Sequence, residues 1–252
     1  IIRRSSAITT AVSLKNNYFE VPGFDAGSPT ADIVNNIKQL TYEAIIRVNN
    51  FKTDEFPKKE IATIMGIEQY CLFRIGDAGF PLQQLQFSSP GENKFPNADT
   101  GKLLQPSEWY HVAVVYDTEK KTAVIYVDGR EQSRIEDYGN GEPVNLGKQT
   151  RGKDFMFKIG HSYGDPDYME RQLDGEICEV RVWNVARSQQ EIFDNMYNIE
   201  DPANTPGLQA YWKFNEGEGD IAKDYTGHGN DAKAYVKATW PAGIEVTQKN
   251  KE

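Results

Sequence analysis

One polar segment, residues 161–172, carries side-chain types that could recognise a sugar. Its candidate ligand-binding residues are Tyr163, Asp165, Asp167, Tyr168 and Arg171. A tyrosine ring offers a flat surface to the C–H face of a sugar, while carboxylate and guanidinium groups form hydrogen bonds with its hydroxyls. The same composition also suits an ordinary solvated turn, because aspartate and proline are common turn formers. Both interpretations stay open.

A second segment, residues 224–231, carries groups that could bind a metal ion. Asp224 and Asp231 supply carboxylates, and the glycines between them leave main-chain carbonyls accessible. These are the hard oxygen ligands that calcium prefers, although the spacing is not that of an EF-hand. Asx-turns explain the same residues. Calcium is therefore the cofactor that the sequence suggests, with Asp224 and Asp231 as candidate ligands, and the turn interpretation remains beside it.

Residues 160–164 match the Gly-x-Ser-x-Gly pattern of a nucleophile elbow, centred on Ser162. That device requires a strand, a sharp turn and a helix, which together expose the serine on an α/β sheet. Here an Asp-Pro-Asp turn follows, and then another strand-like run. The context argues against catalysis by Ser162.

The histidines and cysteines point to structural roles. His111, His161 and His228 are spread through the chain without metal-ligand spacing, so zinc is unsupported. His111 sits in an apolar strand-like run and is predicted to be a satisfied core histidine. Cys71 and Cys178 also lie in apolar runs. This placement predicts buried free thiols, with a disulfide between them as the alternative.

The clearest structural signal is a pair of β-rich runs at residues 109–116 and 122–127. Both alternating sets of side chains are largely apolar. The hairpin is therefore predicted to lie in the middle of a sheet with both faces covered and Trp109 well buried. Asp128 and Gly129 then predict a tight turn, because glycine tolerates the positive φ that two-residue hairpin loops need. The chain returns along residues 130–134 to give a three-strand meander.

The rest of the chain is also rich in predicted strands. They cover residues 18–21, 41–51, 61–67, 70–75, 82–87, 155–160, 173–183 and 207–214. Residues 31–40 fit a short helix or a loop, and the sequence from Ser188 to Glu191 is a capping box that predicts one short helix. Without a composition break or repeat, we predict an N-terminal arm at 1–10 and a single domain at 11–247. The fold class is an all-β sandwich of two antiparallel sheets with one or two short helices.

The composition limits the classes of molecule that this chain could bind. The 252 residues include 28 basic and 37 acidic side chains, for a formal net charge of −9. Nucleic acid is disfavoured, because phosphate binding needs a basic footprint that is absent from the sequence. No apolar run approaches the roughly 18 residues of a membrane span. The chain begins at Ile1 without a leader, so we expect any export signal to have been removed.

Several blocks of the sequence resemble one family. The central hairpin, from Trp109 to Gly129, is similar to that of laminin-G-like domains of the concanavalin A-like lectin/glucanase superfamily. The strand at 173–183 with its capped helix, and the block at 207–214 followed by 224–231, resemble further family blocks. The resemblance spans roughly residues 11–240. It implies a two-sheet antiparallel jelly roll, as found in surface glycan-utilisation lipoproteins, and hence an extracellular or outer cell-surface location.

The superfamily also includes glucanases, so catalysis is a real alternative. Retaining enzymes need two carboxylates about 5–5.5 Å apart, and the family places them in a Glu-x-Asp-x-x-Glu strand. The nearest match begins at Glu176, but Cys178 and Arg181 occupy the other two carboxylate positions. Glu176 and Glu179 are instead predicted to be solvent-facing strand residues.

The leading functional prediction is a non-catalytic carbohydrate-binding module of an exported or cell-surface glycan-handling protein. Its partner would be an oligosaccharide or polysaccharide. The alternatives are a glycoside hydrolase of the same superfamily and a structural or protein-adhesion domain that contacts surface proteins without binding glycan. The fold does not decide between them, because lectins, adhesion modules and glucanases share it.

Overall fold

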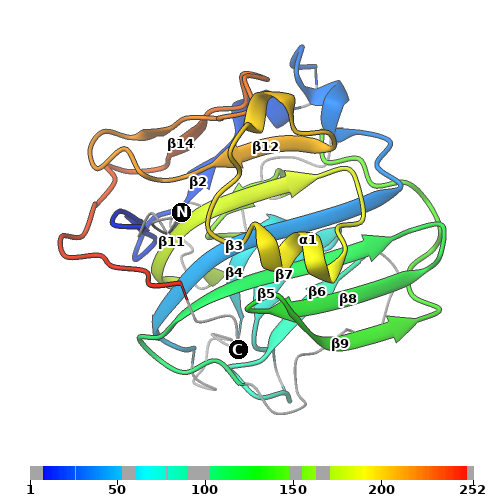
Figure 1. Cartoon of the computed structure of the whole chain (residues 1–252), viewed down its shortest axis with the longest axis horizontal. Coiled ribbons are helices and arrows are strands. Elements are labelled where there is room, and N and C mark those ends of the chain that lie inside the picture. Colours follow the sequence, from blue (N-terminus) through cyan, green and yellow to red (C-terminus); the bar gives the residue numbers. More distant parts are fainter. Residues whose placement is uncertain are drawn as a thin grey trace, which may run out of the picture.

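In the computed structural model, the chain folds into two antiparallel sheets packed face to face (Figure 1). The predicted all-β sandwich is confirmed. The structure describes residues 8–25, 27–52, 61–77, 79–89, 103–147, 155–162 and 171–248.

The first sheet has the strand order β1-β11-β3-β7-β8-β9, with β12 paired to the other part of β11. Its strands are β1 (Val12–Ser13), β3 (Gln39–Asn50), β7 (Trp109–Asp117), β8 (Thr122–Val127), β9 (Arg130–Glu136), β11 (Asp174–Trp183) and β12 (Leu208–Trp212). The predicted meander is confirmed as β7-β8-β9. Its turn has φ values of 49° at Asp128 and 70° at Gly129, which only a few residue types tolerate. A Cβ at Gly129 would also lie 2.8 Å from the Cα of Phe193, so the turn needs glycine for space as well.

The second sheet has the order β13-β14-β2-β10-β4-β5-β6. Its strands are β2 (Phe19–Glu20), β4 (Ala62–Ile67), β5 (Cys71–Ile75), β6 (Leu85–Ser88), β10 (Lys158–Ile159), β13 (Ile221–Ala222) and β14 (Ala232–Ala234). Two of these strands are much shorter than predicted, since only residues 19–20 of 18–21 and 158–159 of 155–160 pair regularly.

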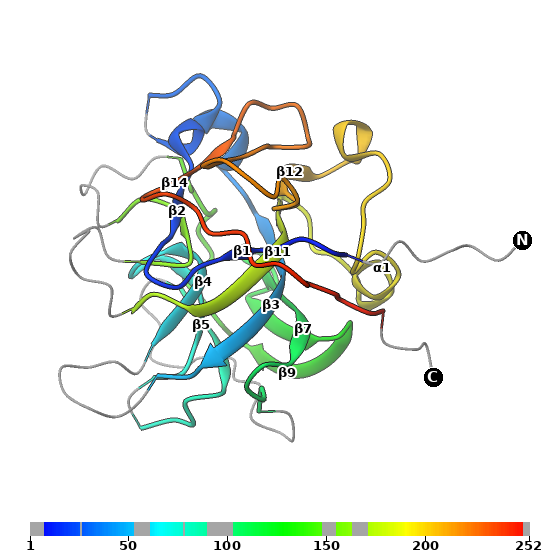
Figure 2. The ribbon, with the colours of Figure 1, turned by 90° about the vertical axis from the view of Figure 1, so that its left-hand side faces the viewer.

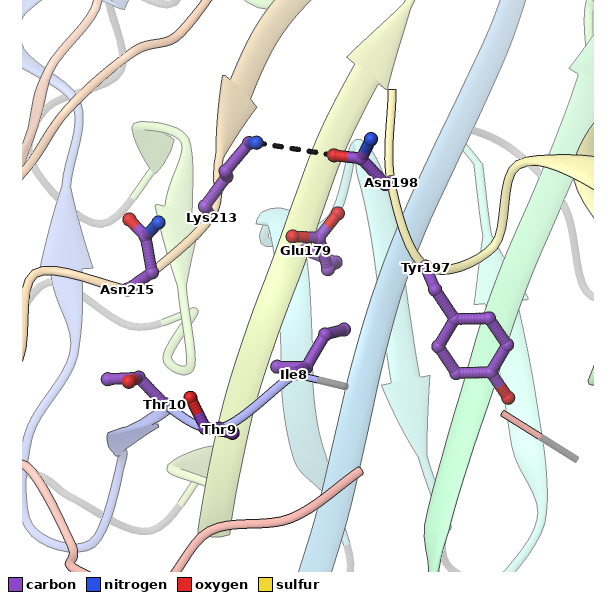
Figure 3. A pocket seen from close by; sticks show the side chains of 8 residues that line it. All are labelled: Ile8, Thr9, Thr10, Glu179, Tyr197, Asn198, Lys213 and Asn215. Atoms are coloured by element: carbon purple, nitrogen blue, oxygen red, sulfur yellow. Dashed lines mark hydrogen bonds between the residues drawn. The ribbon is translucent and has the colours of Figure 1, made fainter. Parts of the chain in front are cut away.

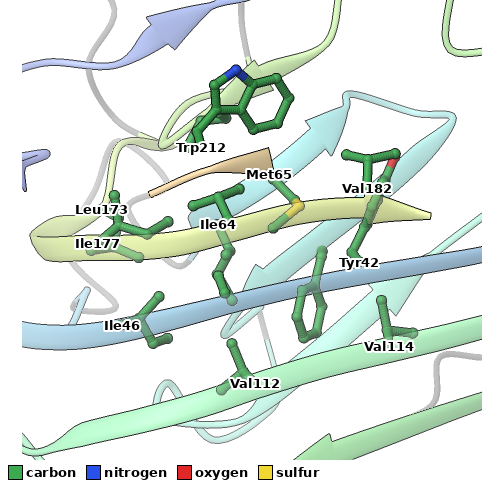
Figure 4. Close-up of a cluster of buried hydrophobic side chains, with 14 of the residues drawn as sticks. Tyr42, Ile46, Ile64, Met65, Val112, Val114, Leu173, Ile177, Val182 and Trp212 are labelled. Carbon is green, nitrogen blue, oxygen red and sulfur yellow. The ribbon is translucent and has the colours of Figure 1, made fainter. Parts of the chain in front are cut away.

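The main core lies between the sheets, where apolar side chains alternate inward along the strands (Figure 4). Trp212 is fully buried there and stacks on Phe157, with a centroid separation of 6.1 Å. Its indole N–H donates to the carbonyl of Asn230 at 2.8 Å. The tryptophan therefore ties β12 to the turn that precedes β14.

A short helix, α1 (Gln189–Asp194), covers the part of the first sheet's outer face that β7 and β8 form (Figure 1). Its predicted capping box is present: the Glu191 amide donates to Ser188 Oγ at 3.2 Å, and the Ser188 amide donates to Glu191 Oε2 at 2.8 Å. Ile192 packs on outward-facing side chains of β7 and β8. Both faces of the central hairpin are therefore covered, as predicted.

Trp109 is only partly buried, so the prediction that it is well buried is wrong. It is the first residue of β7, and the guanidinium of Arg47 lies over its ring at 4.8 Å from the centroid. Of the helix or loop predicted at 31–40, the structure shows a 3-10 turn, η2 (Ala31–Val34), and β3 already begins at Gln39. Two further 3-10 turns are η1 (Pro22–Phe24) and η5 (Pro202–Asn204).

Cys71 and Cys178 are buried free thiols, as predicted, and burial raises the pKa of both.

The two ends of the described chain run side by side (Figure 2), with bridges between Ile8 and Val246 and between Ser13 and Thr239. None of the helices in the described ranges has the length and apolar character needed to cross a membrane.

Candidate functional site

Two tyrosines stack on the outer face of the second sheet. The rings of Tyr18 and Tyr235 are 4.7 Å apart and inclined by only 7°. Tyr18 is 2% exposed, whereas Tyr235 is 41% exposed, so Tyr235 presents its other ring face to solvent. The ring of His161 lies 4.9 Å from that of Tyr18. We call Tyr18, Tyr235 and His161 the tyrosine platform.

Main-chain and amide contacts hold the backbone that carries the exposed ring, and the stack on Tyr18 holds the ring itself. The amide of Tyr235 donates to the carbonyl of Tyr18 at 2.9 Å. The side chain of the buried Asn17 accepts from the amides of Tyr18 (2.9 Å) and Val236 (3.1 Å), and donates to the Val236 carbonyl. Because the ring is held in place before any ligand arrives, binding to it costs little ordering entropy.

Charged groups share this face with the tyrosines. Glu20 in β2 pairs with Lys233 in β14, and both side chains are exposed. Side chains alternate along strands, and Phe19 and Ala234 point into the core. Glu20 and Lys233 therefore point outward like Tyr235 and offer an acceptor and a donor near its ring.

The sequence prediction did not include the tyrosine platform. Residues 232–236 alternate small and long side chains, which is typical of a strand with Lys233 and Tyr235 pointing outward. The run is short, however, and cannot be told from a loop by its sequence. The run at 18–21 is predicted as a strand without a ligand role. Stacking of Tyr18 on Tyr235 follows from the register of β14 on β2, which neither run encodes alone.

Four of the predicted ligand residues, Tyr163, Asp165, Asp167 and Tyr168, lie outside the described residues. The fifth, Arg171, donates from Nη1 to both carboxylate oxygens of Glu68 at 3.3 Å. On one side of the segment 163–170, His161 belongs to the tyrosine platform. On the other side, Arg171 binds Glu68. Ligand contact by these five residues stays a prediction.

The side chains of a second polar cluster on this sheet hydrogen-bond to one another. Arg74 donates to Asp77 at 2.7 Å and to the Gln86 amide oxygen at 3.3 Å, and Gln86 donates to Gln84 at 3.3 Å. Arg74 and both glutamines are buried, and this burial lowers the pKa of Arg74. The cluster stabilises β5 and β6, and the tyrosine platform remains the better candidate for a ligand.

The candidate calcium ligands form hydrogen bonds within the chain. The Asp224 carboxylate accepts from the amides of Tyr211, Thr226 and Asn230 and from the Thr226 hydroxyl, at 2.7–3.2 Å. Asp231 Oδ1 accepts from the Asp224 amide at 2.8 Å. Oδ1 of Asp224 takes three of these contacts and Oδ2 takes one. The contact from the Thr226 amide is an Asx-turn at Asp224, and Asp231 closes the loop by accepting from the Asp224 amide. Calcium at Asp224 and Asp231 stays a prediction.

The prediction that Glu176 and Glu179 face solvent is wrong, since they are 7% and 4% exposed. Glu176 accepts from Arg47 Nε at 3.0 Å and from the Asn49 amide at 2.9 Å. Glu179 accepts from Arg181 Nη2 at 2.6 Å and from the hydroxyl of Tyr211. Both carboxylates accept hydrogen bonds from side chains of neighbouring strands, which a propensity argument about one strand does not reveal.

Arg181 is the centre of a buried polar network under the segment that follows α1. It is fully buried and donates to Glu43 at 3.3 Å, to Glu179, and to the carbonyls of Asn195 (2.8 Å) and Met196 (3.2 Å). The carbonyl contacts tie this segment to β11, while Glu43 extends the network to β3.

His111 borders this network, and its ring is 1% exposed. It is buried as predicted, but neither ring nitrogen hydrogen-bonds to a described residue, so it is not a satisfied histidine. Its Nε2 lies 3.9 Å from Glu43 Oε1.

Because His111 is buried, we expect the protein to lose stability in mild acid. Burial lowers its pKa from 6.5 to about 4, so the unfolded state binds more protons between these values. The contribution is fully present above pH 6.5 and falls as the pH drops towards about 4, by up to about 1.4 kcal/mol per pH unit. Urea unfolding at several pH values measures the slope. A His111→Gln variant should have a shallower slope in this window, and equal slopes would contradict the assignment.

The sequence model of the concanavalin A-like lectin/glucanases superfamily matches residues 22–193. Among solved structures, a candidate carbohydrate-binding protein from Bacteroides ovatus ATCC 8483 is 30% identical, with a TM-score of 0.75 over 98% of this chain and 63% of its own. The chain thus spans 63% of the length of that protein.

Two further structures are more distant. The CBM40 domain of the Ruminococcus gnavus IT-sialidase, bound to α2,3-sialyllactose, is 13% identical, with a TM-score of 0.49 over 75% of this chain and 96% of its own. A heptameric SAP-like pentraxin from Limulus polyphemus is also 13% identical, with a TM-score of 0.48 over 71% and 81% of the two chains. Comparison with curated proteins gives no match. The sequence model covers more than half of the chain, which belongs to the concanavalin A-like lectin/glucanase superfamily.

Proposed function

We propose that this chain is a carbohydrate-binding module and that the tyrosine platform is its contact surface. The observation that carries the proposal is the exposed ring of Tyr235, held by its stack on the buried Tyr18. An aromatic face packs against the C–H face of a sugar, and neighbouring polar groups fix its orientation. Glu20 and Lys233 supply such groups on the same face.

Family membership supports this proposal without deciding it, because the fold hosts several functions. The Bacteroides ovatus neighbour is described as a candidate carbohydrate binder. We further propose that the module works within an exported or cell-surface glycan-handling protein without catalysing a reaction itself. In the same proposal, Tyr163, Asp165, Asp167, Tyr168 and Arg171 extend the contact from the tyrosine platform.

A glycan array followed by calorimetric titration tests the proposal. The array selects the oligosaccharide, and Tyr235→Ala is expected to weaken its binding about tenfold, roughly 1.4 kcal/mol, because the stacking surface is lost. Tyr235→Phe keeps the ring and should bind within about twofold of wild type.

Phe80 provides a matched control, since it is also 41% exposed but follows β5 at another part of the second sheet. Phe80→Ala should leave the affinity unchanged. Equal affinity of wild type and Tyr235→Ala would remove the tyrosine platform from the site. An array without hits would favour the adhesion alternative.

A further inference from the structure

A separate polar pocket of about 180 Å³ lies on the first sheet (Figure 3). It forms where β11, the chain that follows β12 and the segment after α1 meet residues 8–10, which precede β1. Its lining residues are Ile8, Thr9, Thr10, Glu179, Tyr197, Asn198, Lys213 and Asn215. None of these residues belongs to the tyrosine platform, which lies on the other sheet.

The most unusual group in this pocket is the carboxylate of Glu179. The residue has a φ of 53° at the irregularity in β11 between Cys178 and Arg181, a conformation that costs a non-glycine residue energy. It is 4% exposed, and its Oε2 accepts from Arg181 and Tyr211. Its Oε1 hydrogen-bonds to no described residue, and Figure 3 shows the carboxylate among the pocket residues. The pocket thus contains a buried acceptor with one oxygen left for a ligand.

Hydrogen-bond donors surround this acceptor. Lys213 Nζ donates to Asn198 Oδ1 at 3.3 Å and has two further protons to donate. The amide oxygen of Asn215 accepts from the hydroxyl of Tyr225 at 2.9 Å, which leaves its NH₂ group as a donor. The hydroxyls of Thr9 and Thr10 can donate or accept.

The charges favour a neutral ligand. Glu179 and Lys213 carry opposite charges at the pocket, and behind it Arg181 is balanced between Glu179 and Glu43. A cationic group would meet Lys213, and an anionic group would meet Glu179. A hydroxyl satisfies both, because it accepts from the ammonium and donates to the carboxylate.

We propose that this pocket binds one neutral sugar residue. Its volume is below the roughly 300–1,000 Å³ of pockets for drug-sized ligands, so it suits a single ring better than a chain. This second site extends the proposed carbohydrate binding but shares no residue with the tyrosine platform, so each site can fail without the other.

Amide-resolved NMR of the full chain tests the second site. Separate titrations with D-glucose, D-galactose, D-mannose and N-acetyl-D-glucosamine should give, for at least one of them, saturable shifts at Glu179, Asn198, Lys213 and Asn215. Lys213→Met and Asn215→Ala, which avoid the Arg181 network, should each weaken that binding at least about fivefold through a lost hydrogen bond. Tyr235→Ala should leave it unchanged.

Three results would overturn this proposal. The first is the absence of shifts at the pocket with all four sugars. The second is loss of the pocket shifts in Tyr235→Ala, which would assign them to the tyrosine platform. The third is saturable binding of glycine at the same amides with a higher affinity than any of the four sugars, which would identify a zwitterion site. Thermal unfolding of each variant confirms that it is folded before the titration.

Discussion

Replacing Arg181 with methionine is expected to lower the free energy of unfolding by about 3–5 kcal/mol. The guanidinium is fully buried and donates to Glu43 and Glu179, which are themselves buried. Removing the cation leaves two carboxylates without their cationic partner in a region of low dielectric, and that desolvation penalty dominates the loss. Urea unfolding at pH 7 measures the change.

An exposed ion pair provides the matched comparison. Arg134 donates to Glu131 at 2.8 Å, and the two side chains are 44% and 37% exposed. Arg134→Met should cost less than about 1 kcal/mol, because water already solvates both charges. A variant that combines Arg181→Met with Glu43→Gln and Glu179→Gln should recover part of the loss. Equal costs for Arg181→Met and Arg134→Met would show that the buried network does not stabilise the fold.

Replacing Trp212 with alanine is expected to cost about 3–5 kcal/mol, as large aromatic truncations in a core do. Its ring is fully buried against Phe157 and Phe24, and its indole N–H holds the Asn230 carbonyl. The variant therefore leaves a cavity between the sheets and an unsatisfied carbonyl.

Trp109→Ala is the control for Trp212→Ala, since Trp109 is only partly buried at the start of β7. It should lose less than half as much stability in the same urea unfolding measurement. A larger loss for Trp109→Ala than for Trp212→Ala would mean that the principal core is not between the two sheets.

The parts of the fold that local patterns determine could be predicted from the sequence. The β7-β8-β9 meander follows from alternation and from the turn at Asp128 and Gly129, and α1 follows from the capping box at Ser188. The cover on the outer face of the first sheet could not be predicted in this way. It depends on where the segment after β11 packs, and for this reason the sequence predicts the wrong exposure for Glu179.

The candidate site could be predicted even less completely. Tyr18 and Tyr235 are far apart in the sequence, and the register of β2 on β14 brings their rings together. Aromatic and charged residues concentrated in one loop are visible in the sequence, whereas a platform made by two short strands is not. The pocket at Glu179 likewise depends on an irregularity in β11. His161, the first residue of the loop that the sequence singles out, belongs to the tyrosine platform.

A crystal structure of the protein with the oligosaccharide that the array selects is the most direct test of carbohydrate binding at the tyrosine platform. We expect a sugar ring lying flat on the open face of Tyr235, opposite Tyr18, with hydroxyls within hydrogen-bond reach of Glu20 or Lys233. An oligosaccharide bound elsewhere, with the ring of Tyr235 still facing solvent, would contradict it.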